Sequence, residues 1–192
     1  MSSSAEFVSG DSNNAQNVTW TSDQSSSHVI HSYHLVSQQD FAELNGYAQD
    51  STSYYSMGST PGLTWQIGED VVVRSLFSHD GVLQNSSDIP PRAVSNNWPV
   101  FALAADLGTV GSTVSDPVVW SLGIVRNQSI NALGESRSAY YWSNFSSPTD
   151  VVSRTTYIAV LNTDLTSRWI FLSQISRGPK LPRPHSTRAF VC

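Results

Sequence analysis

Short apolar runs separated by polar turns dominate this chain, and most of them have the length and the residue types of a β-strand. The clearest is "PVVWSLGIVR" (117–126), in which Trp120, Leu122 and Ile124 fall on one face and small residues on the other. Other short segments rich in β-branched or aromatic residues are predicted strands at 17–22, 28–36, 63–68, 69–77 and 138–145. Such a series, with polar turns between the strands, favours a sandwich or barrel over alternating β and α units.

The segment "NNWPVFALAADLG" (96–108) gives conflicting signals, because its alanines favour a helix and its surroundings favour a strand. Pro99 is acceptable at the first position of either element. The stretch between Trp98 and Gly108 is short for a helix. We therefore predict a strand over 99–106, buried on both faces, whose small alanines let another element pack closely.

The pattern changes near residue 146. Ser147 offers a capping hydroxyl, Pro148 suits the first helical position, and Asp150 suits the positive end of a helix dipole. A helix is predicted from about 148 to 162, and a second helical piece near Asp164. The prolines of "RGPKLPRPHSTR" cannot continue it. The predicted fold is mainly β: an antiparallel sandwich that need not be complete over 1–146, a helical segment over 147–176, and an irregular Pro/Arg-rich tail over 177–192.

Charged residues are scarce in this chain, and their distribution is uneven. Charged residues make up only 13% of the 192 residues, against about 25% in ordinary soluble domains, and Ser, Thr and Asn replace them. The net charge is −5, although the tail after Leu165 holds five basic residues and no acid. The preceding body is therefore acidic and repels phosphate backbones, so we expect no nucleic-acid partner.

The compartment is less well defined by the sequence. No apolar run approaches the ~20 residues of a membrane-spanning helix, so no membrane partner is expected. "MSSSAEFVSGD" has neither the basic start nor the apolar stretch of a signal peptide. The only cysteine is Cys192, which excludes an internal disulfide and a cysteine-ligated metal site.

Histidines and carboxylates are the first candidates for catalytic or metal-binding groups in this sequence. His28, His31 and His34 are spaced three apart, but on a strand His31 points away from the other two, which lie roughly 20 Å from each other. Glu69 and Asp70 would likewise face opposite sides of a strand. There is no Gly-x-Ser-x-Gly elbow, phosphate-binding glycine loop or dinucleotide fingerprint. We assign no catalytic, cofactor-binding or metal residue and expect no cofactor.

Asparagines and tryptophans supply weaker signals. Glycosylation sequons, scarcely more than the composition alone would give, occur at Asn17, Asn85, Asn127 and Asn144 and matter only in a secretory protein. Tryptophans in or beside predicted strands are Trp20, Trp65, Trp98, Trp120 and Trp142. Core packing is their more frequent role, since a sugar-binding platform needs several of them exposed on one face.

Several motifs together strongly resemble the N-terminal domain of the glutaminase A family, known chiefly from filamentous fungi. They are "AEFVSGD" at 5–11 (with Phe7 where the family has Trp), "GEDVVVRS" at 68–75, "RAV" at 92–94, "NWPVFALAADLG" at 97–108 and "SRSAYYWSNFSSPTDVV" at 136–152. The likeness covers roughly residues 3 to 165. Such long, ordered agreement is more specific than any one motif.

The resemblance implies a β-sandwich from a secreted amidase that hydrolyses glutamine to glutamate and ammonia. In that family the sandwich precedes a helical barrel domain of the same chain, which carries much of the active site. We therefore expect a non-catalytic accessory sandwich. Arg74, Trp98 and Asp106 lie in the best-matched motifs, without an assigned role.

The family sequence also starts earlier and continues further, and the tail here departs from it. A fragment or truncated gene model is the corresponding expectation, and the isolated chain is expected to be marginally stable or prone to aggregate. Two other functions stay open. One is a carbohydrate-binding module with exposed aromatic platforms, and the other is a structural module that supports a partner domain.

Overall fold

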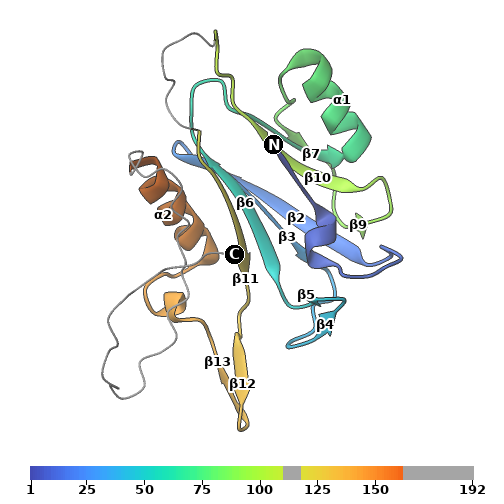
Figure 1. The fold of residues 1–192 in the computed structure, drawn as a ribbon, viewed down its shortest axis with the longest axis vertical. Helices are drawn as coiled ribbons and strands as arrows, with labels where there is room; N and C mark the ends of the chain where they lie inside the picture. The colour runs from blue at the N-terminus through green and yellow to red at the C-terminus, as the bar shows by residue number, and fades with distance from the viewer. Residues whose placement is uncertain (110–117, 162–192) are drawn as a thin grey trace, which may run out of the picture.

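The computed structural model describes residues 1–109 and 118–161, which form two facing β-sheets with a helix on each outer side (Figure 1). The first sheet has the strand order β1-β10-β7-β8, comprising Ser2–Ser4, Pro99–Ala104, Thr64–Glu69 and Ser86–Ser87. The second has the order β11-β6-β3-β2-β9, comprising Trp120–Val125, Thr52–Gly58, His28–Leu35, Asn17–Gln24 and Arg92–Ala93. All neighbouring pairs in the two sheets are antiparallel except β7–β8. The predicted mainly-β fold is confirmed.

Smaller elements decorate the sandwich. Two short hairpins pair β4 (Glu43–Leu44) with β5 (Tyr47–Ala48), and β12 (Ile130–Ala132) with β13 (Glu135–Arg137). One-turn helices occur at η1 (Ala5–Val8) and η2 (Tyr140–Ser143). Neither the hairpins nor η1 had been predicted, because such short elements lack a periodic signal.

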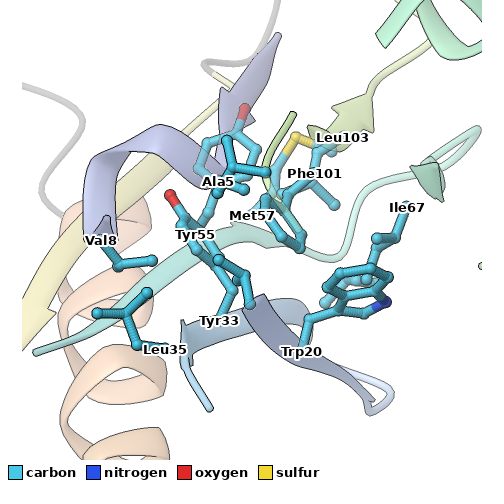
Figure 2. Packing of buried hydrophobic residues seen from close by; sticks show 13 residues of the cluster. Ala5, Val8, Trp20, Tyr33, Leu35, Tyr55, Met57, Ile67, Phe101 and Leu103 are labelled. Atoms are coloured by element: carbon cyan, nitrogen blue, oxygen red, sulfur yellow. The ribbon is translucent and has the colours of Figure 1, made fainter. Parts of the chain in front are cut away.

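The main core lies between the two sheets. Phe101 of β10 stacks on Tyr33 of β3, with ring centroids 3.9 Å apart and planes 4° from parallel, and meets Trp20 of β2 edge-on at 6.0 Å. Figure 2 shows side chains from both sheets and from η1 turned toward one another around these rings. Aromatic and aliphatic burial of this kind is the main favourable contribution to folding.

Strand β10 is buried on both faces, as predicted for 99–106. Phe101 and Leu103 point into the main core, whereas Ala102 and Ala104 join a second apolar cluster on the outer side. That cluster also contains Val73 of helix α1 (Asp70–Asp80). The small alanines do let another element pack closely, and that element is α1.

The predicted strand at 69–77 is wrong, because this segment forms α1. The run of valines favoured a strand, since β-branched residues fit pleated surfaces. On a strand, Val71 and Val73 would share a face, yet Val71 is 79% exposed and Val73 only 1%. Asp70 in the first turn pairs with Arg74, and the buried contact of Val73 outweighs the weak helix propensity of valine.

Helix α1 ends at residues 78–81. Residues 78–80 are the last helical residues, and Gly81 closes the helix with a φ of 71° in the left-handed region. Its N–H donates to the Phe77 carbonyl at 2.9 Å. A glycine just past the last turn is the usual way to end a helix, because a side chain there is strained.

We therefore expect Gly81→Ala to lower the free energy of unfolding by about 1 kcal/mol. Gly123→Ala is the matched control. Neither glycine has an atom within 4 Å of the added Cβ, but only Gly81 has a positive φ. Urea denaturation should show no loss for Gly123→Ala, and equal stability of both variants would contradict this explanation of the helix end.

The predicted strand at 138–145 is also wrong, because η2 occupies its centre. The Asn144 and Phe145 N–H groups both donate to the Tyr141 carbonyl at 3.0 Å, and the Ser143 hydroxyl donates to the Tyr140 carbonyl at 2.7 Å. These local hydrogen bonds thus take the place of the backbone hydrogen bonds that would pair the segment with a neighbouring strand. Aromatic content raises β propensity only where a neighbouring strand offers an edge.

Helix α2 (Pro148–Leu161) confirms the helix predicted from about 148 to 162. The Asp150 N–H donates to the Ser147 hydroxyl at 3.1 Å, as the capping signal indicated. The helix lies against β6 and β11 on the outer side of the second sheet, where Val151 and Val152 are buried. The helical piece predicted near Asp164 and the tail at 177–192 lie outside the described residues.

The remaining predicted strands, at 17–22, 28–36, 63–68 and 117–126, are confirmed as β2, β3, β7 and β11. Strand β6 is not among the predicted strands, although it occupies the second position of its sheet. Its segment, "TSYYSMG", mixes serines with aromatics on both faces. Ser53 and Ser56 are both buried, so apolar alternation did not mark the strand.

Candidate functional site

His31 is the most deeply buried of the histidines that the structure describes. It points into the core, where its Nε2 donates to the Ala102 carbonyl at 3.3 Å and its ring lies 5.6 Å from that of Trp65. Burial lowers the pKa of His31 to about 4, although the Ala102 carbonyl raises it. His28 and His34 are only partly buried, as expected from strand alternation. Within residues 1–109 and 118–161, no group of three or more His, Cys, Asp or Glu could hold a metal ion.

His31 should make stability depend on pH. In the unfolded chain its pKa returns to about 6.5, whereas the folded chain keeps it neutral down to about 4. Above pH 6.5, the contribution of His31 to the free energy of unfolding is fully present. As the pH falls toward 4, that contribution, about 3 kcal/mol, is lost. Urea denaturation from pH 7.5 to 4 should show this decline, and His31→Gln should flatten it. The exposed His79→Gln is the control, and an unchanged slope in His31→Gln would contradict the assignment.

A serine and a histidine meet between α2 and the second sheet. The Ser153 hydroxyl lies 3.3 Å from His28 Nε2, and His28 Nδ1 lies 3.0 Å from the Ser27 hydroxyl and 3.2 Å from that of Ser25. A nucleophilic pair needs a third group that orients the base. Here that position is filled by serine hydroxyls and not by a carboxylate. The contact therefore fastens α2 to β3, and it joins residues too distant in sequence for any pattern to reveal.

An ion pair fastens β11 to the loop before β6. Arg126 Nε and Nη2 donate to the two carboxylate oxygens of Asp50 at 2.8 and 2.7 Å, and the Phe41 N–H donates to the same carboxylate at 3.0 Å. Burial disfavours the charged form of Asp50, but the hydrogen bonds from Arg126 and Phe41 outweigh it and lower its pKa. The charged groups of Asp50 and Arg126 thus hold the fold together. Sequence patterns gave no sign of this pair.

The family-motif residues do not form one site. Arg74 Nε lies 2.5 Å from Asp70 Oδ1, and the Trp98 carbonyl accepts the Asp70 N–H at 3.1 Å, so both adjoin the start of α1. Asp106 lies beyond the opposite end of β10, where its Oδ1 accepts the Gly108 N–H at 2.8 Å. A Cβ on Gly62 would come within 2.7 Å of the Asp106 Cβ. The contacts of Arg74 and Trp98 support the start of α1, and the contact of Asp106 supports the turn after β10.

A hollow of about 220 Å³ lies between α1 and the first sheet. Val73, Phe77 and Leu83 line one side, and Ala102 and Leu103 the other. A substrate site needs a few converging polar groups in such an apolar setting. The only charged side chain in the lining, Arg74, is already paired with Asp70.

Comparison with known proteins identifies the chain's relatives. The sequence profile described as "Domain of unknown function (DUF5127)" matches residues 1–157. The chain belongs to this family. It is also similar to "Glutaminase A" of Aspergillus oryzae (strain ATCC 42149 / RIB 40), with 36% identity over 135 residues, which are 69% of this chain and 19% of that protein. The chain thus spans about a fifth of the length of this relative, and no solved structure matches it.

The similarity confirms the kinship with glutaminase A that the motifs indicated. The DUF5127 match includes every motif on which that resemblance rested. Among the helices in the described part of the DUF5127 chain, none has the length and apolar character needed to cross a membrane.

The four sequon asparagines of the DUF5127 chain, Asn17, Asn85, Asn127 and Asn144, are all exposed. Asn85 also supports the fold, because its Oδ1 accepts the Trp65 N–H at 2.9 Å. The amide nitrogen that a glycan would occupy is not used in that contact. The structure therefore leaves each of them available as a glycosylation candidate.

The tryptophans that the structure describes in the DUF5127 chain are divided between core and surface. Trp20 is buried, and its Nε1–H lies 3.2 Å from the Asp88 carbonyl, to which it donates. The exposed Trp98 and Trp120 belong to different sheets, one before β10 and the other on β11. They do not share the single face that a sugar-binding platform requires.

Proposed function

We propose that this chain is a non-catalytic β-sandwich part of a glutaminase A-type amidohydrolase, which releases ammonia from glutamine. The similarity to Glutaminase A of Aspergillus oryzae is the observation that carries the proposal. Its natural partner would be the helical barrel domain of the same polypeptide. The whole protein would be secreted, with glycans at some of the four sequons.

The chemistry of the described residues supports the non-catalytic part. Hydrolysing an amide needs an activated water or nucleophile, an acid that protonates the leaving ammonia, and donors for the developing oxyanion. His31 is enclosed in the core, and His28 is held among serine hydroxyls. The Asp50 carboxylate is bound by Arg126. These groups stabilise the scaffold and do not converge on a cavity.

A chimera tests the proposal. Residues 1–157 of this chain would replace the matching segment of Aspergillus oryzae Glutaminase A, and ammonia release from glutamine would be measured. We expect kcat within a few fold of the parent enzyme. The double variant His28→Ala, Ser153→Ala should keep that kcat, because neither side chain takes part in the reaction.

Two results would contradict the proposal. One is a folded chimera, with a cooperative thermal transition, that releases no ammonia. The other is a folded double variant whose kcat falls by about 100-fold or more, the usual effect of removing an acid–base group. A variant that merely lowers the thermal midpoint and keeps kcat agrees with a supporting role.

A further inference from the structure

Among the residues that the structure describes, one stretch of the inner surface of the sandwich is left exposed. In the register of β11 with β6, Trp120 lies opposite Met57, Leu122 opposite Tyr55, and Ile124 opposite Ser53. Directly opposed residues point to the same side of a sheet. The β6 members of these pairs are buried in the core. The β11 members are exposed, Leu122 by 56% and Ile124 by 59%.

The first sheet ends too early to cover β11. Its terminal strand, β1, is joined to β3 by a hydrogen bond of 2.6 Å between the Ser3 and Tyr33 hydroxyls. In the facing sheet, β3 is separated from β11 by β6. Helix η1 contacts β6 and helps to bury it, but the surface formed by Trp120, Leu122 and Ile124, here called the β11 face, stays open.

The hairpin that follows extends this open region. Every residue of β12 and β13 is exposed, including Ile130, and Leu133 at the turn is exposed completely. Figure 1 shows the hairpin projecting from the end of β11, away from both sheets. A two-stranded hairpin alone is marginally stable in water. A body resting against this hairpin would bury its exposed apolar residues and stabilise it.

We propose that the β11 face and the β12–β13 hairpin form a docking surface for the remaining polypeptide of a glutaminase A-type protein. This inference rests on the proposed function, because the matched segment is only 19% of the relative and four-fifths of that protein lie outside it. The occupant is an apolar face of that polypeptide, since the sequence of β11, "WSLGIV", contains no charged residue. Covalent linkage gives such an occupant a high effective concentration, which an unlinked partner lacks.

Thiol labelling tests the proposal in the chimera described above and in the 192-residue chain with Cys192→Ser. Ile124→Cys probes the β11 face, and Ile89→Cys, at a site that is 88% exposed, is the matched control. Labelling of each introduced thiol by a small alkylating reagent is followed by mass spectrometry of its peptide. In the 192-residue chain both thiols should react quickly. In the chimera the thiol at position 124 should react at least tenfold more slowly, with position 89 unchanged.

Equal labelling rates at position 124 in the two proteins would overturn the proposal. So would protection in the 192-residue chain that grows with its concentration, because a second copy would then cover the face. The outcome is independent of ammonia release. An active chimera with a reactive position 124 refutes only the docking surface, and an inactive chimera with a protected position 124 refutes only the proposed function.

A second measurement applies if the chimera does not fold. The 192-residue chain is mixed with the rest of Aspergillus oryzae Glutaminase A, supplied as a separate polypeptide, and their affinity is measured. Ile124→Lys should weaken association at least tenfold, and Ile89→Lys should leave it unchanged. Absence of association at about 1 mM, the order of the effective concentration that a covalent link supplies, or equal affinities of the two variants, contradicts the docking surface.

Discussion

Replacing Arg126 with alanine is expected to lower the free energy of unfolding by about 3 kcal/mol, because it leaves a buried carboxylate without its partner. The Asp50 side chain is only 6% exposed, and Arg126 supplies two hydrogen bonds to it. After the substitution, the Phe41 N–H still donates to the carboxylate, at 3.0 Å. Desolvation would then oppose the charge of Asp50, and its pKa should rise toward or above its ordinary value.

The control for Arg126→Ala is Arg137→Ala. Arg137 pairs with Glu135 on the hairpin, and both side chains are largely exposed. Exposed pairs of this kind contribute about 0–1 kcal/mol. Urea denaturation at pH 7 measures both variants. Similar small losses in the two would show that the Asp50–Arg126 pair does not fasten β11 to the sandwich.

Replacing Phe101 with alanine is expected to cost about 3–5 kcal/mol, enough to unfold a marginally stable domain. Phe101 is fully buried, and its ring contacts those of Tyr33 and Trp20 across the two sheets. Its removal leaves a cavity at the centre of the layer shown in Figure 2. The loss should appear as a lower denaturation midpoint or as failure to accumulate in soluble form.

Phe7→Ala is the control for the core substitution. Phe7 is 44% exposed in η1, so its truncation should cost less than about 1 kcal/mol. A second variant, Phe101→Leu, keeps most of the buried volume and should cost less than the alanine. A Phe101→Ala protein as stable as Phe7→Ala would contradict a core centred between the sheets.

The fold class could be predicted because the strand signals are local. Segment 117–126 alternates with a period of two, 28–36 is rich in β-branched and aromatic residues, and 99–106 was placed by its length and flanking residues. The helix from Pro148 was also predictable, because capping chemistry is local. These features depend on neighbours in sequence, which a single chain reveals.

The wrong predictions concern segments whose structure depends on distant contacts. The valines of α1 favour a strand by propensity, but the site where Val73 can be buried is the alanine face of β10. The aromatic residues of η2 favour a strand, yet the Tyr141 carbonyl accepts two backbone N–H groups that follow it and closes a helical turn. Tertiary context overrides weak local preference in both.

The candidate interaction surface was predictable only in part. Alternation placed Trp120, Leu122 and Ile124 on one face of a strand. It did not show that this face lies on the inner side of the sandwich and is left uncovered, because that depends on where the first sheet ends. The motif residues Arg74, Trp98 and Asp106 were singled out by resemblance, and their contacts place them at a helix start and a turn.

In our proposal these residues supply a scaffold, and the amide chemistry of a glutaminase A-type enzyme resides elsewhere. The most direct test is an assay of the purified, folded 192-residue chain for ammonia release from glutamine, beside Aspergillus oryzae Glutaminase A under the same conditions. We expect a rate no higher than that of the buffer alone. Ammonia release by the 192-residue chain at an enzymatic rate, retained after further purification, would contradict it.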